Sequence, residues 1–252
     1  MTATLRRGSS QPRRVTVGLH GYGSFGRLVA QALEGRVDLH IYDPVSSPGQ
    51  ERFEIAAACD IVILAMPVQR MRAALLVLRP LLRDDCVLID VSSVKVEPAS
   101  LMLELAPPTC AILATHPLFG PQSARRGLDG AKIALVPVRG GREARRIAAY
   151  LRRDFRLAIH WVTADEHDRE MAYVQGLTHL IARIVGDMTL PPIRLSTRTF
   201  DLMREMVSLV ENDSDDLWGA IVYENPHAAS AIREFAQSLD IVRGAIGPRR
   251  NR

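Results

Sequence analysis

Two short segments carry the side chains best suited to chemistry. They are Asp90-Val91-Ser92-Ser93-Val94-Lys95 and Thr115-His116-Pro117-Leu118-Phe119-Gly120-Pro121. Each follows an apolar run typical of a buried strand, and open α/β sheets present their ligands at the carboxyl ends of strands. Because serine hydroxyls and imidazoles can donate and accept protons, the two segments indicate an enzyme.

A glycine-rich turn, Gly21-Tyr22-Gly23-Ser24-Phe25-Gly26, lies upstream of both segments. A strand-like run precedes it, a helical pattern from Arg27 to Leu33 follows it, and a second strand-like run ends at Asp43. A GxGxxG match alone is weak evidence. A strand, glycine turn, helix, strand and acid within roughly 30 residues are nevertheless typical of a dinucleotide-binding unit.

Each residue of the turn has a physical task in such a unit. Gly21 permits the tight turn, Gly23 lets the backbone approach the pyrophosphate, and Gly26 lets the helix pack close to the strand. The free amides at the start of the helix, at Ser24 and Phe25, are expected to hold the phosphates.

The acid after the second strand bears on the choice of cofactor. Asp43 can accept hydrogen bonds from both ribose hydroxyls and would repel a 2′-phosphate, so NAD is favoured over NADP. The alternative is that Asp43 only caps a turn together with Pro44.

Length and composition are consistent with an enzyme of two domains. The 252 residues are 47% hydrophobic, enough to bury a large core. No segment approaches the roughly 18 uninterrupted apolar residues of a membrane span, and no apolar secretion signal begins the chain. We therefore expect a cytoplasmic protein without a membrane partner.

The net charge of +4 depends on arginines near the two ends of the chain, namely Arg6, Arg7, Arg13, Arg14, Arg249, Arg250 and Arg252. Without these seven charges the body is slightly acidic, so no nucleic-acid partner is expected. Cys59, Cys86 and Cys110 lack CxxC spacing, which indicates neither a disulfide framework nor a metal site.

Strand-like runs alternate with helical patterns up to about residue 163. We expect strands at 61–65, 86–91, 111–114, 132–137 and 157–161, and helices near 51–58, 68–81 and 97–105. This order predicts an α/β fold with an N-terminal Rossmann-type, doubly wound, mostly parallel sheet.

The pattern then becomes purely helical. Helices are expected at 165–188, 196–210 and 215–245, with Pro191-Pro192 separating the first two. The predicted organisation is therefore a disordered tail at 1–13, a dinucleotide-binding domain at 14–163, an all-helical domain at 164–247 and a basic tail at 248–252.

The motifs in this order resemble the prephenate and arogenate dehydrogenase family of tyrosine biosynthesis. The resemblance covers Val15 to about Ala245. It rests on five segments: the glycine turn, the strand ending before Met66-Pro67, Val91–Lys95, His116–Pro121 and His167–His179. The last three together are specific to the family.

The resemblance implies an NAD(P)-dependent oxidative decarboxylation of a cyclohexadienyl substrate. Hydride leaves the carbon bearing the 4-hydroxyl, and carbon dioxide leaves the ring. His116 is the implied base that takes the hydroxyl proton, and Ser93 is the implied serine that hydrogen-bonds the histidine and the hydroxyl. Met66 and Pro67 are assigned to the cofactor. The alternatives are a structural role for His116 and a helix cap for Ser93.

The predicted substrate is a small dicarboxylate or an amino acid, and Ser92 is a candidate contact for it. The resemblance places the helix face that carries Gln175 and His179, spaced i and i+4, at this substrate. Arg183 lies one further turn along the same face, at i+8, and is a candidate contact because of that spacing. His179 could equally be a satisfied core histidine. The charge run at 165–170 is typical of a solvated helix start, and no catalytic role is assigned to His167.

One departure from the family concerns the arginine that binds the ring carboxylate. In many members of the family this arginine lies shortly before an Asp-Pro-x-x-aromatic segment. The comparable stretch of this chain, residues 207–218, contains no arginine. Because a buried carboxylate requires a cationic partner, we expect Arg183, Arg198 or Arg204, or a cation from a partner subunit, to take its place. Arg183 is preferred.

The helical domain resembles a substrate and dimerisation module. Its apolar stripe, which predicts a homodimer, comprises Met203, Met206, Val207, Leu209, Leu217, Trp218, Ile221 and Val222. Packing within one domain would explain the same stripe.

Two other functions stay open. One is another two-domain Rossmann oxidoreductase of the hydroxyacid or imine type, although no lysine follows Lys132 to act as its acid. The other is a nonenzymatic NAD-sensing regulator, although the body lacks the basic character of a DNA-binding face.

Overall fold

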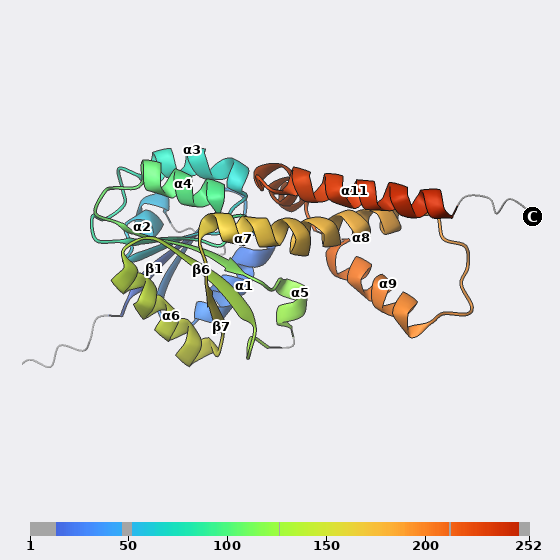
Figure 1. The fold of residues 1–252 in the computed structure, drawn as a ribbon. Helices are drawn as coiled ribbons and strands as arrows, with labels where there is room; N and C mark the ends of the chain where they lie inside the picture. The colour runs from blue at the N-terminus through green and yellow to red at the C-terminus, as the bar shows by residue number, and fades with distance from the viewer. Residues whose placement is uncertain (1–13, 47–51, 126, 212, 247–252) are drawn as a thin grey trace, which may run out of the picture.

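The computed structural model describes residues 14–46, 52–125, 127–211 and 213–246. The two tails expected at the ends of the chain lie outside these residues. The described chain forms an α/β unit and a helical unit that extends away from it (Figure 1). Strand β7 ends at Trp161 and helix α7 begins at Ala164, so the predicted boundary near residue 163 falls in the short link between them.

Seven strands form one sheet in the order β2-β1-β3-β4-β5-β6-β7, and every neighbouring pair is parallel except β5 and β6. The sheet confirms the predicted Rossmann-type fold. The strands are β1 (Thr16–His20), β2 (Asp38–Tyr42), β3 (Ile61–Leu64), β4 (Val87–Asp90), β5 (Ala111–Pro117), β6 (Lys132–Arg139) and β7 (Ala158–Trp161).

Helices cover both faces of the sheet because the central strands are apolar on both sides. One face packs against α2 (Phe53–Ala57), α3 (Val68–Leu78) and α4 (Val96–Leu105), and the other against α1 (Ser24–Leu33) and α6 (Gly141–Phe155). Val62 and Leu64 face the first layer, whereas Ile63 faces the second. This alternation follows from the two-residue period of a strand.

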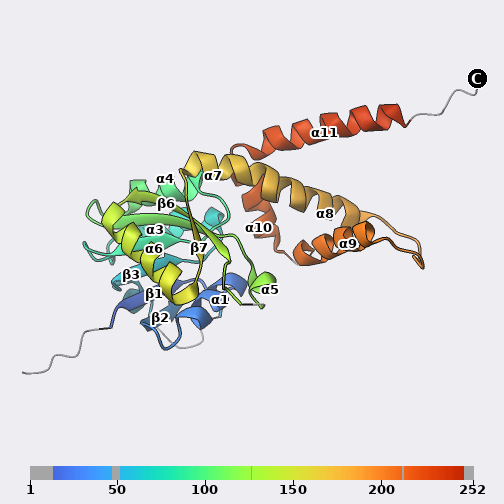
Figure 2. The same ribbon diagram turned by 60° about the horizontal axis from the view of Figure 1, so that its bottom comes forward.

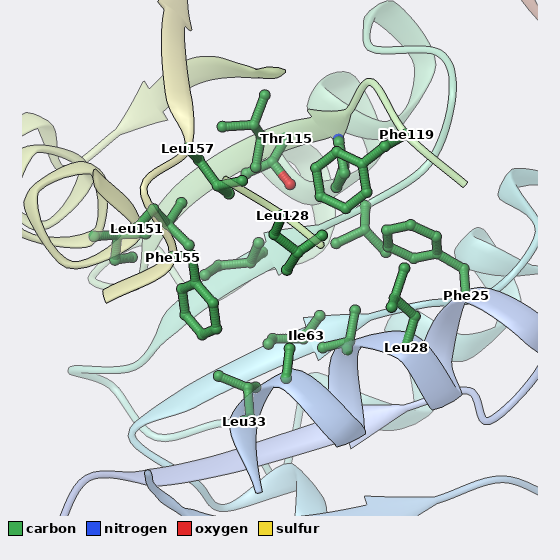
Figure 3. Close-up of a pocket in the computed structure, with 17 residues that line it drawn as sticks. Phe25, Leu28, Leu33, Ile63, Thr115, Phe119, Leu128, Leu151, Phe155 and Leu157 are labelled. Carbon is green, nitrogen blue, oxygen red and sulfur yellow. The ribbon is translucent and has the colours of Figure 1, made fainter. Parts of the chain in front are cut away.

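The second face holds an apolar cavity of about 130 Å³ between α1 and α6 (Figure 3). Phe25 of α1 and Phe119, which follows β5, point into it with their ring centroids 6.4 Å apart. A short helix, α5 (Pro121–Ala124), continues the segment after Phe119. The side chain of Phe25 is therefore directed into this cavity, and its backbone lies at the glycine turn.

The helical unit begins with a long continuous helix, made of α7 (Ala164–Met171), a π-helical segment η1 (Ala172–Leu177) and α8 (Thr178–Asp187). Thr163 and Glu166 form a capping box at its start, as this spacing favours. Helix α9 (Arg198–Val210) follows.

The last helix predicted from the sequence, 215–245, is interrupted. It divides into α10 (Asp215–Gly219), the π-helical segment η2 (Ala220–Glu224) and α11 (Ala228–Ala245). The prediction was wrong here because Pro226 lacks a backbone N–H, and the preceding Asn225 adopts extended backbone, at φ −82° and ψ 114°.

The helical unit buries little of its own surface. Figure 2 shows α8, α9 and α11 projecting away from the sheet. Helix α9 has no buried residue, and α11 buries only Ala228 and Ala231. In the described part of the chain, no helix combines the length and apolar character needed to cross a membrane.

Candidate active site

The carboxyl ends of four parallel strands align along one edge of the sheet. His20, Leu64, Asp90 and Ala114, at or near the ends of β1, β3, β4 and β5, share one register line. The glycine turn begins one residue after this line, and Met66-Pro67, Ser92-Ser93 and His116 follow it by two or three residues. The topology therefore gathers most of the residues predicted for catalysis and cofactor binding at a single edge.

Close backbone packing explains two glycines of the turn. Gly21 has a φ of +109°, and a Cβ there would lie 2.2 Å from the carbonyl oxygen of Ala65. A Cβ on Gly26 would lie 2.1 Å from the carbonyl oxygen of Gly21. Larger residues at these two positions would push apart the turn, the start of α1 and the end of β3.

Gly23 differs because open space surrounds it. A Cβ there would meet no atom within 4 Å, and Gly23 is the cap residue of α1, so no side chain satisfies the first N–H groups of that helix. Ser24 is exposed beside it. An uncapped helix start with free space in front of it fits a phosphate group, so this edge could hold the pyrophosphate of a dinucleotide.

Asp43 caps the turn that follows β2 and also ties it to the glycine turn. Its Oδ1 accepts hydrogen bonds from the N–H groups of Val45 (2.8 Å) and Ser46 (3.0 Å), and its Oδ2 accepts one from Tyr22 (2.7 Å). Partial burial opposes ionisation, but these donors outweigh it and lower the pKa of Asp43. The turn-capping alternative is therefore present in the structure, and the lowered pKa keeps the Asp43 carboxylate charged at the end of β2.

Met66 and Pro67 lie against the glycine turn. Both are half-buried, Met66 packs against the core under α3, and Pro67 caps that helix. The N–H of Ala65 donates to the carbonyl of His20 at 2.8 Å, which holds this segment beside β1.

His116 lies inside β5, opposite Ala134 of β6, and is only 4% exposed. The strand thus continues past the end expected at residue 114. Burial, followed by the nearby His167 and Lys95, lowers the pKa of His116 well below its usual value of 6.5. The imidazole is therefore neutral at pH 7 and able to accept a proton.

The hydrogen-bond partner of His116 is His167, whose Nε2 lies 2.8 Å from His116 Nδ1. His167 Nδ1 lies 2.7 Å from Oδ1 of Asp168, and both residues of α7 are buried, at 2% and 0% exposure. The expectation of a fully solvated helix start was wrong for these two. Helical spacing could have indicated the burial of His167. It lies four residues before the apolar Met171, so both residues share the face of α7 that packs inward.

A buried ion pair lies directly behind the histidine. Lys95 Nζ bonds the Asp90 carboxylate and donates to the carbonyl of Thr115 at 2.5 Å. Burial lowers the pKa of Lys95, and the Asp90 carboxylate opposes this shift. The pair fixes the end of β4 to the end of β5.

The two serines sit in the turn after β4. Ser92 donates from both its N–H and its hydroxyl to Asp90, so its side chain is engaged within the turn. Ser93 is half-buried, and the described residues include no hydrogen bond between Ser93 and His116. Its expected bond to the histidine therefore stays a prediction for the substrate complex.

The predicted stripe on the long helix faces α10 and the residues before it. His179 Nδ1 lies 3.8 Å from Asp213, and the Arg183 guanidinium lies 4.0 Å from Asp215 and 4.9 Å above the ring of Trp218. Burial lowers the pKa of His179, although Asp213 opposes the shift. Burial also raises the pKa of Asp213.

Gln175 lies at the start of this stripe, within η1. Its Oε1 is buried and has no hydrogen-bond partner among the residues that the structure describes. A buried acceptor without a donor is costly, so this oxygen marks a position where a ligand could donate a hydrogen bond.

The other two candidate arginines lie on the exposed surface of α9. Arg204 lines a shallow depression with Asp201, Glu205 and Ser208. Within the described ranges, neither Arg204 nor Arg198 nor Arg183 forms a hydrogen bond or ion pair with the cluster around His116.

The arrangement can support proton abstraction by a histidine beside a bound dinucleotide. A neutral, buried imidazole stands at the same sheet edge as a helix start suited to a dinucleotide phosphate. From β1 to β5 there are three strand spacings, about 14 Å, so an extended dinucleotide bound at the glycine turn can reach toward His116.

Comparisons with known proteins agree with this geometry. The model described as "Prephenate dehydrogenase, nucleotide-binding domain" matches residues 36–152, and "Prephenate dehydrogenase, dimerization domain" matches residues 163–251.

Two curated relatives are similar over most of this chain. Arogenate dehydrogenase 1, chloroplastic, from Arabidopsis thaliana is 23% identical over 253 residues, covering 88% of this chain and 38% of the relative. The T-protein of Haemophilus influenzae is 28% identical over 233 residues, covering 87% of this chain and 59% of the relative. The chain thus spans about two fifths of the length of the first relative and three fifths of the second.

Among solved structures, the fold is similar to prephenate dehydrogenase from A. aeolicus in complex with hydroxyphenyl propionate and NAD+. The TM-score is 0.69 at 20% identity, with 94% of each chain covered.

Proposed function

The chain belongs to the prephenate dehydrogenase family, and we propose that it is an NAD-dependent oxidoreductase that oxidatively decarboxylates a cyclohexadienyl acid in tyrosine biosynthesis. One observation carries the proposal most directly. His116 is buried and neutral at the sheet edge that also holds the glycine turn. Such a histidine can act as a general base beside a bound nicotinamide.

The proposed reaction needs only one proton acceptor. His116 would take the proton of the ring hydroxyl while the carbon bearing it becomes a carbonyl and gives up hydride. NAD, when bound, would supply the hydride acceptor. The bond from the ring to its carboxylate then breaks, carbon dioxide leaves, and the electron pair makes the ring aromatic. The phenolate oxygen that results takes the proton back from His116. Because aromatisation is strongly favourable, the chain mainly has to align the two reactants.

NAD is the proposed cofactor rather than NADP. The negatively charged Asp43 lies at the end of β2, where it would attract ribose hydroxyls and repel a 2′-phosphate. Gly23, Ser24 and the backbone of Phe25 would hold the pyrophosphate, and Met66 and Pro67 would contact the cofactor from β3.

The proposed substrate site lies between the sheet edge and the stripe on the long helix. The unpartnered oxygen of Gln175 supports a contact with the substrate. Arg183, half-exposed beside Trp218, is the proposed cation for a carboxylate. His179 would add a donor, and Ser92 and Ser93 would approach from the turn after β4.

A homodimer through the helical unit is part of the proposal. Of the predicted apolar stripe, only Ile221 is buried within a single chain. On α11, Leu239, Ile241 and Val242 are 53%, 74% and 54% exposed. The match to a dimerization domain supports covering these side chains with a second copy.

The test is to assay the purified protein with NAD or NADP and with prephenate or arogenate. Formation of the reduced cofactor together with carbon dioxide from one of the two acids is the expected result. The absence of turnover with both acids and both cofactors, in a folded protein that binds NAD, would contradict the proposal.

A further inference from the structure

Three buried side chains form a line from the sheet into the helical unit. His116 Nδ1 lies 2.8 Å from His167 Nε2, and His167 Nδ1 lies 2.7 Å from Asp168 Oδ1. None of the three is more than 4% exposed. His116 belongs to β5, whereas the other two belong to α7.

The chain of hydrogen bonds ends at the Asp168 carboxylate, both oxygens of which accept from backbone N–H groups. Asp168 Oδ1 accepts from the N–H of Lys95 at 2.7 Å, and Oδ2 accepts from the N–H of Val96 at 2.8 Å. These N–H groups lie at the start of α4, where the helix dipole favours negative charge. Asn225 further donates to the backbone carbonyl of Asp168 at 2.8 Å, which fixes the residue in place.

The acceptor role of the Asp168 carboxylate determines where the protons of both imidazoles lie. Both of its oxygens accept backbone N–H groups, so Asp168 faces His167 as an acceptor, and Nδ1 of His167 carries the proton and donates it. In a His167 ring whose single proton is on Nδ1, Nε2 is an acceptor, and the proton between the two rings belongs to Nδ1 of His116. Because His116 is itself neutral, its Nε2 has no proton. Within the described chain, this Nε2 makes no hydrogen bond.

We propose that His167 and Asp168 are positioning residues that hold His116 in the tautomer whose Nε2 is free to accept a proton. The role of that atom as base rests on the proposed function, whereas the tautomer itself does not. The dyad also stabilises the base after proton transfer, because the imidazolium then donates to His167 with a carboxylate directly behind it. The other charged groups near His116 are Lys95 and Asp90, which pair with each other at the end of β4.

Helix α7, the first helix of the helical unit, would thus control the protonation of His116 in β5. A merely structural dyad would tie α7 to α4 and to β5 without selecting a tautomer. The two possibilities differ in one observable, the location of the proton on the His116 ring.

The experiment measures that location by ¹⁵N NMR of the ligand-free protein labelled at its histidine ring nitrogens, near pH 7. A His116→Asn variant assigns the signals of His116. In the unmodified protein we expect a protonated Nδ1 and an unprotonated Nε2. In Asp168→Asn the amide can donate to His167 and reverse the chain, so the proton of His116 should move to Nε2.

Two further variants complete the design. His167→Phe keeps an aromatic ring but removes the acceptor, and it should likewise give an Nε2-protonated His116 if Asp168→Asn fails to fold. His227→Asn is the matched control, because His227 forms a comparable pair with Asp165 at the start of α7, with Nε2 2.8 Å from Oδ1, but does not touch His116. It should leave the tautomer unchanged.

Turnover with the acid identified by the assay should fall about 10²- to 10⁴-fold in Asp168→Asn, the range for a base in the wrong tautomer. A proton on Nε2 of His116 in the unmodified protein, or an unchanged tautomer in both variants, would overturn the proposal. The expected tautomers without turnover on any cyclohexadienyl acid would support the positioning role and contradict only the proposed function.

Discussion

Removing the buried ammonium of Lys95 should strongly destabilise the protein. In Lys95→Met the side chain keeps its length, but the Asp90 carboxylate loses the cation that pairs with it. Both groups are fully buried, at 0% exposure. Breaking such a pair typically costs about 3–5 kcal/mol because a buried charge is left without compensation.

The surroundings of Asp90 place the expected cost at the lower end of that range. Its carboxylate still accepts from the N–H and hydroxyl of Ser92 and from the N–H of Thr115 at 3.2 Å. We therefore expect a loss of about 3 kcal/mol, a large part of the roughly 5–15 kcal/mol that stabilises a typical domain. With a urea m-value of about 3 kcal/mol/M, the unfolding midpoint should fall by about 1 M.

The assay is urea unfolding followed by circular dichroism, on the single variant and on the double variant Lys95→Met/Asp90→Asn. The double variant replaces the pair by neutral groups, so it should recover at least half of the lost stability. A single variant that loses less than about 1 kcal/mol, or a double variant no more stable than the single one, would refute the description of Lys95 as the counterion of Asp90.

The remaining predictions concern catalysis and binding. His116→Asn should fold and bind NAD but lose turnover by about 10²- to 10⁴-fold, with a smaller loss in Ser93→Ala, and equal losses in steady-state kinetics would argue against their separate roles. Since the pKa of His116 is lowered below 6.5, its imidazole stays neutral at mildly acidic pH. The acid limb of kcat/KM should therefore lie below pH 6.5, and folding stability should decrease as the pH falls through 6.5 toward the folded-state pKa. An acid limb at or above pH 6.5 would contradict the lowered pKa of His116. Asp43→Ser should narrow the preference for NAD over NADP in kcat/KM, and equal use of both by the unmodified protein would remove the basis for the assignment. Arg183→Ala should raise the KM for the ring acid while leaving the Kd of NAD unchanged, and an unchanged KM would exclude Arg183 as the carboxylate partner.

Local patterns in the sequence were sufficient to predict the sheet. Apolar runs, the glycine turn and helical periodicity each depend on neighbouring residues, so the strands and the turn at Gly21 could be placed without knowledge of long-range contacts. The break at Asn225 was missed although Pro226 signalled it, because the helical pattern continues on both sides.

The environment of His116 could be predicted only in part. The resemblance to a family indicated the histidine itself, but its partner His167 lies 51 residues further along the chain. His167 and Asp168 lie within a run of charged residues, and such a run is typical of a solvent-exposed helix start. Their burial depends on how α7 packs against α4 and β5, which no local pattern reveals.

The small buried surface of the helical unit has a consequence for how the molecule responds to its own concentration. Isolated helices are marginally stable in water, and α9 has no buried residue within one chain. In the proposed homodimer, the order of this unit should therefore follow mass action and rise with the concentration of protomers, whereas the sheet contains its own core. Dilution would then loosen the helices that hold Arg183 and Trp218 before it affects the dinucleotide edge. Substrate affinity would become sensitive to protein abundance while the affinity for the cofactor would not.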